Sequence, residues 1–430
     1  MKKREVVIIG GGPGGAATAL YLIQAGIKPL IVERQSFPRF HIGESLSGEC
    51  GNSIRKLNLE AELLAQNYPI KYGVNVYNPQ GVPFWVEVKR RCPETNAMLP
   101  NWTWSVTRSS FDKILLDAAL ERGAEYMNCD AVAPLQKNGR VIGLQIRTSG
   151  GALENLHCDV LVDCSGQATF LANRGVTGPK VKGNYANQIG VFSQIEDMTL
   201  DSGSEPSKSL GNTLIFYKER DHWAWAIPLN PRLVSVGVVA PAAYFKDQGL
   251  DKTEYLRREL VTLNPELSRR VTKTSFVEEV RSVTSYSYAA TKYAGPGFIC
   301  VGDSHQFTDP IFSFGVFLAI KEGEFAAEAI GKHLGGEGNS RENPFTEYLA
   351  VTTEGQDAIR DVIDTFWEYP LVFTRMASGA AQDDITDLFA GRVYGEIVQK
   401  NASRAAMRRL LAERRIHSAS ARREATSVAA

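Results

Sequence analysis

The sequence has little cysteine and histidine, and neither residue type is clustered. The six cysteines, at positions 50, 92, 129, 158, 164 and 300, show no CxxC spacing, and the six histidines form no HExxH motif. This scatter excludes a disulfide framework and predicts no metal site. We expect the cysteines to be reduced thiols in a cytoplasmic protein.

The sequence also lacks an excess of charge and any long apolar segment. Lys plus Arg is 48 and Asp plus Glu is 48, which excludes the strongly basic surface of a dedicated nucleic-acid binder. No apolar run approaches the roughly 18 residues of a membrane span, and the run at residues 6–9 is too short for a signal peptide. We therefore expect no nucleic-acid or membrane partner. The last 29 residues carry seven Arg against two Glu, which is typical of a solvated helix but leaves an anionic partner open.

A glycine-rich loop near the N-terminus gives the clearest structural signal. It follows a β-branched strand at residues 6–9 and precedes a helix of small residues. Gly10, Gly12 and Gly15 form a G-x-G-x-x-G motif, in which the glycines permit a tight turn, backbone approach to a pyrophosphate and close packing of helix on strand. Glu33 follows the next strand and suits the hydroxyls of an unphosphorylated ribose. The segment predicts a dinucleotide site for FAD or NAD rather than NADP.

The rest of the chain divides by the type of predicted element. Residues 173–285 are predicted to be mostly strands with one helix near 252–264, a strand at 298–301 returns to the first domain, and residues from 343 onward are predicted to be helical. The fold class is therefore α/β, with a Rossmann-like domain, an inserted β-rich domain and a helical C-terminal region. The predicted boundaries are 1–70, 101–172 and 286–335 for the dinucleotide domain, 71–100 and 173–285 for the β-rich substrate domain, and 336–430 for the helical region.

Two later segments favour FAD over NAD. Gly302-Asp303 follows a strand and resembles the segment that places an Asp on the ribityl chain in class A flavoprotein monooxygenases and their relatives. Arg108 resembles the Arg that opens a helix after the second flavin-contacting segment of that superfamily. The resemblance implies a discontinuous FAD-binding domain. The remaining residues expected to bind FAD are Arg34, Ser45 and Gly315.

Three further motifs resemble those of flavin-dependent halogenases. Residues 223–228 read WAWAIP, which matches WxWxIP, and residues 307–315 match FxxPxxSxG. Residues 37–45, FPRFHIGES, are similar to the FPRxHIGES stretch of the phenol- and pyrrole-acting branch. Since side chains two apart on a strand share a face, Trp223 and Trp225 are expected to line one surface.

The resemblance, which spans residues 1 to about 330, implies an enzyme and its cofactors. Reduced FAD from a separate flavin reductase would react with O2 and a halide ion to give hypohalous acid. The acid would be guided to Lys71 and attacked by an electron-rich ring, a phenol or pyrrole that is free or tethered to a carrier protein. Lys71 has largely apolar and aromatic neighbours, and burial among such groups lowers the pKa of a lysine.

The same resemblance assigns the halide and the active-site wall. The backbone N–H groups of Phe314 and Gly315 are expected to hold the halide, because oriented N–H groups at the start of a helix suit an anion. The expected wall that keeps the substrate away from the flavin consists of Trp223, Trp225, Pro310 and Ser313.

Two positions depart from the family pattern. Tryptophan-acting halogenases have Glu where this chain has Phe312, which argues against free tryptophan as the substrate. Phe314 stands where the family often has a small or polar residue. The alternative is therefore an FAD-dependent monooxygenase or dehydrogenase on the same scaffold, without halide use.

Overall fold

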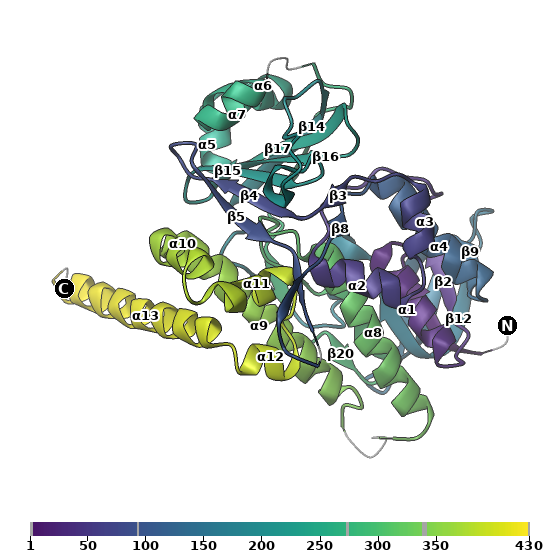
Figure 1. Ribbon diagram of the computed structural model, residues 1–430. Helices are drawn as coiled ribbons and strands as arrows, with labels where there is room; N and C mark the ends of the chain where they lie inside the picture. The colour runs from purple at the N-terminus through teal and green to yellow at the C-terminus, as the bar shows by residue number, and fades with distance from the viewer. Residues whose placement is uncertain (1–2, 93, 272–274, 338–341, 429–430) are drawn as a thin grey trace.

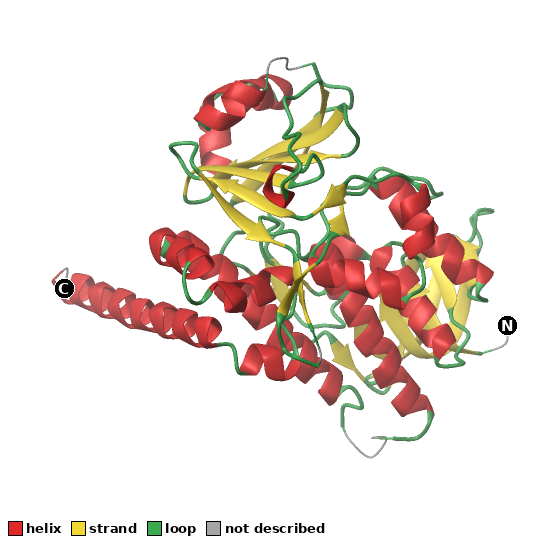
Figure 2. Cartoon of the chain, viewed as in Figure 1, coloured by secondary structure: helices red, strands yellow, loops and turns green. Residues whose placement is uncertain are grey.

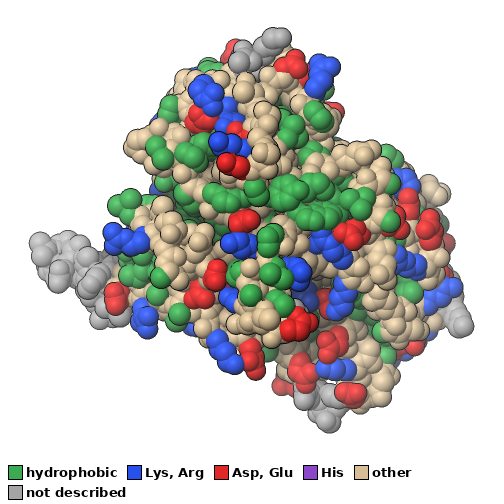
Figure 3. Space-filling view, viewed as in Figure 1, with side chains coloured by type: hydrophobic (Ala, Val, Ile, Leu, Met, Phe, Trp, Pro, Cys, Tyr) green, Lys and Arg blue, Asp and Glu red, His purple; other side chains and the backbone are tan. Residues whose placement is uncertain are grey.

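The computed structural model describes residues 3–92, 94–271, 275–337 and 342–428 as two lobes with a helical extension (Figure 1). Figure 2 shows strands at the centre of both lobes, with helices packed around them. The predicted α/β class is confirmed, with a β-rich lobe inserted into a Rossmann-like one. Hydrophobic side chains gather in a band where the two lobes meet (Figure 3).

The sheet of the first lobe is built from segments far apart in the chain. Its parallel strands lie in the order β9-β2-β1-β12-β21. Residues 6–8 of β1 are fully buried, as expected for a strand covered on both faces. The bounds are β1 (Arg4–Ile9), β2 (Leu30–Glu33), β9 (Glu125–Asn128), β12 (Leu153–Asp163), β20 (Ala294–Gly295) and β21 (Phe298–Cys300).

Helices and a hairpin complete the first lobe. Helix α1 (Pro13–Gln24) packs between α4 (Arg108–Glu121) and α8 (Gly315–Leu334). A turn at Asn138-Gly139 joins β10 (Asp130–Lys137) to β11 (Arg140–Arg147), and both turn residues have positive φ. Such a turn matches the twist of the strands that it joins.

The seven-stranded sheet of the second lobe combines an early hairpin with later strands. Its order is β18-β14-β17-β16-β15-β4-β5. One face packs on α6 (Lys252–Thr262), and the other face carries Phe192, Trp223 and Trp225 toward the first lobe. The bounds are β4 (Gly73–Tyr77), β5 (Pro83–Glu87), β14 (Gln188–Glu196), β15 (Thr213–Glu219), β16 (His222–Pro228), β17 (Leu233–Pro241) and β18 (Arg281–Thr284).

In the described parts of the chain, short strands form two pairs and one three-stranded sheet beside the two main sheets. Strand β3 (Ile70–Lys71) pairs with β8 (Thr103–Trp104) and carries Lys71 into the junction. The other short strands are β6 (Lys89–Arg91), β7 (Met98–Pro100), β13 (Lys180–Lys182), β19 (Tyr288–Ala290) and β22 (Gln306–Phe307).

Two groups of shorter helices flank the sheets. Helices α2 (Gly48–Lys56) and α3 (Glu60–Ala65) are separated where the chain turns at Asn58, whose φ is 55°. Helix α6 is flanked by two short helices that the pattern missed, α5 (Ala242–Asp247) and α7 (Pro265–Arg270).

The C-terminal region is helical. Helix α9 packs on α8, and α13 projects away from the body (Figure 1). No helix within the described ranges combines the length and apolarity needed to traverse a lipid bilayer. The bounds are α9 (Thr346–Glu368), α10 (Pro370–Ser378), α11 (Gln382–Ala390), α12 (Gly395–Gln399) and α13 (Ala402–Val428).

Candidate active site

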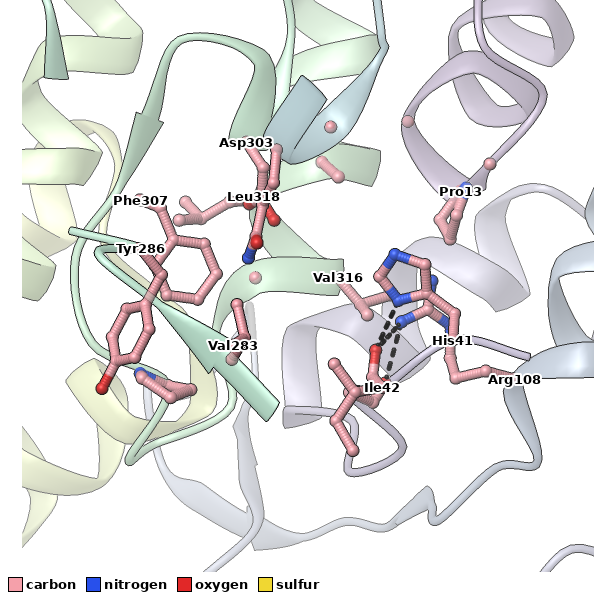
Figure 4. Close-up of a pocket in the computed structure, with 18 of the residues that line it drawn as sticks. Pro13, His41, Ile42, Arg108, Val283, Tyr286, Asp303, Phe307, Val316 and Leu318 are labelled. Atoms are coloured by element: carbon pink, nitrogen blue, oxygen red, sulfur yellow. Dashed lines mark hydrogen bonds between the residues drawn. The ribbon is translucent and has the colours of Figure 1, made fainter. Parts of the chain in front are cut away.

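A cavity of about 640 Å³ lies at the junction of the two lobes. This volume falls within the range of about 300–1,000 Å³ that is common for small-molecule sites. The cavity is lined by the glycine loop, the loop at residues 39–45, the inner face of the second sheet and the segment at residues 303–319. Gln356 and Ile359 reach it from α9. Figure 4 shows His41, Ile42 and Arg108 on one side and Tyr286, Phe307 and Asp303 on the other.

The three glycines of the motif are required for different reasons. Gly10 has φ +97°, and a Cβ at Gly15 would lie 1.9 Å from the Gly10 carbonyl oxygen, so both positions are fixed by the fold itself. A Cβ at Gly12 would meet only a guanidinium nitrogen of Arg39, at 3.2 Å. Gly12 thus leaves a backbone surface open at the start of α1, where N–H groups favour a phosphate.

Glu33 lies at the same end of the cavity and is buried. Its Oε2 accepts a hydrogen bond from the Gly11 N–H at 2.8 Å, and its Oε1 accepts one from the Gln35 N–H at 2.7 Å. Each carboxylate oxygen retains a second lone pair that could accept a ribose hydroxyl. Arg34 is exposed and lines the rim beside it.

Arg108 fixes the loop at residues 39–45. Its guanidinium donates to both carboxylate oxygens of Asp112, at 2.7 and 3.0 Å, and to the carbonyl oxygen of Ile42 at 2.5 Å. The same carbonyl accepts a hydrogen bond from His41 Nδ1, as Figure 4 shows. The positive charge of Arg108 lowers the pKa of His41 below its usual value, which favours the neutral imidazole at pH 7.

Asp303 lines the cavity at the turn after β21. Burial raises the pKa of its carboxyl to about 7. The turn is held from behind by Glu322, which accepts hydrogen bonds from the Gly302 N–H at 2.6 Å and from Gln356 Nε2 at 2.8 Å. Glu322 is also 2.9 Å from His305 Nε2. Helices α8 and α9 together therefore position Asp303.

The segment from Pro310 to Gly315 enters the cavity and opens α8. Pro310, Ser313, Phe314 and Gly315 all line the cavity, and Ser313 has φ +60°. Apart from its chain neighbours and its own helix, the only described atom that a Cβ at Gly315 would meet within 4 Å is Asp303 Oδ1, at 4.0 Å. Because the first N–H groups of a helix have no partner within it, this space suits an anion.

Trp223 and Trp225 share one face of β16, as the strand period predicts. Both are buried and line the cavity, and their ring centroids are 5.8 Å apart with 48° between the planes. The indole N–H of Trp225 donates to Ser235 Oγ at 3.3 Å. The pair therefore forms a continuous aromatic surface on the side of the second lobe.

Lys71 is buried just behind the cavity wall. It is 3% exposed, and burial lowers the pKa of its ammonium from 10.5 to about 7. Its Nζ donates to Ser45 Oγ at 2.9 Å and to the Leu46 carbonyl at 2.8 Å. Ser45 and Thr213 line the cavity, and their hydroxyls are 2.7 Å apart. Ser45, expected to bind FAD, thus has its hydroxyl against Lys71.

The sequence analysis did not assign several residues that lie at the cavity. Arg39 stands over Gly12 and pairs with Asp112 at 3.3 Å, and its place in the loop at residues 37–45 was the available signal. Gln356 had no such signal, because its position at the cavity depends on how α9 docks.

Phe312 packs on C-terminal helices, with the rings of Phe366, Phe373 and Phe389 as neighbours.

These residues fit FAD. A pyrophosphate finds partners in the open surface at Gly12 and the guanidinium of Arg39 above it. A ribose finds a partner in the carboxylate of Glu33, and a polyol chain finds one in Asp303, which lines the cavity. Residues 3–342 match the family model described as FAD binding domain. The fold and the site thus define an FAD-binding flavoprotein.

Comparison with individual proteins narrows this class. The chain is 34% identical to the 1H-pyrrole-2-carbonyl-[peptidyl-carrier protein] brominase of Pseudoalteromonas luteoviolacea, over 91% of this chain and 92% of the relative. It is 26% identical to the corresponding chlorinase of Pseudomonas fluorescens, over 91% and 89%. The flavin-dependent brominase Bmp2 superimposes with a TM-score of 0.88 at 32% identity, covering 97% of this chain and 100% of that one. The chain belongs to the flavin-dependent halogenases, which confirms the resemblance found in the sequence.

Proposed function

We propose that the protein halogenates a pyrrole ring tethered to a carrier protein, with reduced FAD, O2 and a halide ion as co-substrates. The observation that supports this most strongly is identity along nearly the full length of a brominase whose name specifies such a substrate. FAD, when bound, supplies the oxidising chemistry. Monooxygenase or dehydrogenase activity without halide is not favoured.

The residues expected to bind FAD lie in one part of the cavity. Gly10, Gly12 and Gly15 shape the pyrophosphate site, and Glu33 offers carboxylate oxygens to the ribose. Arg108 acts on the cofactor side mainly by fixing the loop at residues 39–45.

Halide is proposed to bind at the N-terminus of α8, beside Phe314 and Gly315. The helix supplies N–H groups, and the open space at Gly315 admits an ion. Asp303 Oδ1 would border this ion. Because burial raises the pKa of Asp303 to about 7, its negative charge is reduced near neutral pH, and the repulsion between carboxylate and halide weakens.

The substrate ring is proposed to pack on Trp223 and Trp225, with Pro310 and Ser313 closing the cavity toward the flavin. Lys71 lies on this side and supplies the ammonium that acts on hypohalous acid. A separate flavin reductase and a cytoplasmic location are part of the same proposal. Phe312 packs away from the cavity, among aromatic rings of the C-terminal helices, which is consistent with a substrate other than free tryptophan.

Reconstitution with an unrelated flavin reductase tests the proposal. The protein is incubated with FAD, NADH, bromide or chloride and pyrrole-2-carbonyl loaded on a peptidyl carrier protein, and the isotope pattern is read by mass spectrometry. We expect halogenated pyrrole on the carrier, and none with Lys71→Ala, while hydrogen peroxide is still released. Free pyrrole-2-carboxylate and a panel of phenols serve as comparison substrates.

Two experimental results would contradict the proposed function in different ways. Substrate-stimulated oxidation of NADH without the reductase, giving a hydroxylated ring, would overturn the proposal. Halogenation of free phenols with no product on the carrier would overturn the carrier-tethered substrate while leaving halogenation in place.

A further inference from the structure

Ser45, Lys71 and Thr213 form a hydrogen-bonded group at the junction of the two lobes. Lys71 Nζ donates to Ser45 Oγ at 2.9 Å, and Ser45 Oγ lies 2.7 Å from Thr213 Oγ1. The three side chains come from the loop before α2, from β3 and from the first residue of β15. All three are at least 97% buried, so the group is shielded from bulk water.

The residues that carry the two hydroxyl groups line the cavity, whereas the residue that carries the ammonium does not. Ser45 and Thr213 line it together with Trp223 and Trp225, whereas Lys71 is not part of the wall formed by the described residues. The Lys71 ammonium also donates to the Leu46 carbonyl at 2.8 Å, which holds it behind the wall. A molecule in the cavity therefore meets Ser45 and Thr213 before it meets Lys71.

Counting hydrogen bonds leaves one hydroxyl proton for a ligand. Two hydroxyls carry two protons, and the contact between Ser45 and Thr213 uses one of them. Since Lys71 donates to Ser45 Oγ, it occupies one acceptor site of that oxygen and needs no proton from it. When Thr213 donates to Ser45, the remaining O–H is that of Ser45, and the hydrogen bond that Ser45 Oγ accepts from a buried cation makes this O–H a stronger donor.

We propose that Ser45 is the catalytic residue that contacts hypohalous acid, that Lys71 acts through it as the proton source, and that Thr213 positions the Ser45 hydroxyl. This inference rests on the proposed halogenation. The ring carbon bonds to the halogen as the bond from halogen to oxygen breaks, and the leaving oxygen takes the Ser45 proton and becomes water. Ser45 regains a proton from the Lys71 ammonium, and the proton lost by the ring restores that ammonium.

The protonation state of Lys71 agrees with such a relay. A pKa of about 7 makes both the ammonium and the amine accessible at neutral pH, as a group that gives up and regains a proton requires. Cys50 is the titratable group that acts on Lys71 electrostatically, and burial raises the pKa of its thiol to about 12, so it stays neutral.

The test compares Ser45→Ala with Ser193→Ala, a matched loss of a buried hydroxyl on β14 that donates to the Glu278 carbonyl. Halogenated carrier-bound pyrrole and hydrogen peroxide are measured per FADH2 consumed. Ser45→Ala is expected to lose at least about a hundredfold in halogenated product, the scale of a positioned proton donor. FADH2 consumption should stay within about twofold, with peroxide replacing the product, and Ser193→Ala should behave as wild type.

The pH profile provides a readout that a merely structural role would not change. Wild-type halogenation is expected to fall as the pH rises through about 7, since Lys71 loses its proton there, and the residual activity of Ser45→Ala should lack this decline. Thr213→Val should lower the product about tenfold, and Thr213→Ser, which retains a hydroxyl, should restore it. This second pair decides the question if Ser45→Ala does not fold.

The inference and the proposed function fail in different ways. Product from Ser45→Ala within about threefold of wild type, with Lys71→Ala inactive, would overturn the relay and show that Lys71 acts directly. Thr213→Val equal to Thr213→Ser would overturn the role of Thr213. Absence of halogenated product from the wild-type protein would instead overturn the proposed function.

Discussion

Replacing Lys71 with Met measures how much the buried amine lowers the free energy of unfolding. Burial lowers the pKa of Lys71 from 10.5 to about 7. Since a tenfold change in proton affinity is worth about 1.4 kcal/mol, holding the ammonium here costs about 5 kcal/mol when the folded and unfolded chains are both protonated. Met fills a similar volume without a charge, so Lys71→Met removes this cost.

The sign of the effect depends on pH. Because the folded state has the lower pKa, the unfolded chain binds more protons between pH 7 and 10.5, and the stability of the wild-type protein rises with pH across that window. The variant also leaves Ser45 Oγ and the Leu46 carbonyl without their donor, at about 1 kcal/mol each. Lys71→Met should therefore be more stable than wild type by about 3 kcal/mol at pH 6 and less stable by about 1 kcal/mol near pH 10, where part of the protonation cost remains.

Thermal unfolding of the FAD-free protein between pH 6 and pH 10 measures this difference. Lys400→Met is the matched control, since the Lys400 side chain is 76% exposed, and its difference from wild type should not vary across this range. A Lys71→Met variant that is less stable than wild type at pH 6, or a difference that is constant with pH, would refute the reasoning.

Two further predictions concern the glycine loop and the C-terminal helices. Gly15→Ala should not accumulate as folded protein, because its Cβ would overlap the Gly10 carbonyl. Gly12→Ala should keep the melting temperature of the FAD-free protein. In a fluorescence titration, it should weaken FAD binding at least about tenfold. Equal losses of stability in both variants would contradict the division between fold and ligand. Phe312→Ala should lower the free energy of unfolding by about 3–5 kcal/mol in denaturant, because the ring packs among aromatic side chains of the C-terminal helices; an unchanged midpoint would contradict this packing.

Local pattern was sufficient for the N-terminal unit and for the orientation of the tryptophan pair. The β-branched run, the spacing of Gly10, Gly12 and Gly15, and Glu33 after the second strand specify a β–α–β unit through short-range sterics alone. Trp223 and Trp225 were assigned to one face from the period of a strand, and the structure has them side by side. Lys71 was singled out by the family resemblance, and the lowered pKa expected of a lysine buried among apolar groups is present in the structure.

The sequence by itself determined the α/β class, FAD as the cofactor and the halogenase family, because these depend on periodicity and on motifs within short segments. Only the tertiary structure decided which atoms meet across the cavity. Ser45 and Thr213 are 168 positions apart, and no local rule brings their hydroxyls to 2.7 Å. The same holds for Gln356, which reaches the turn before Asp303 by bonding Glu322 on another helix. Such contacts depend on the packing of every element between them, which a one-dimensional pattern does not encode.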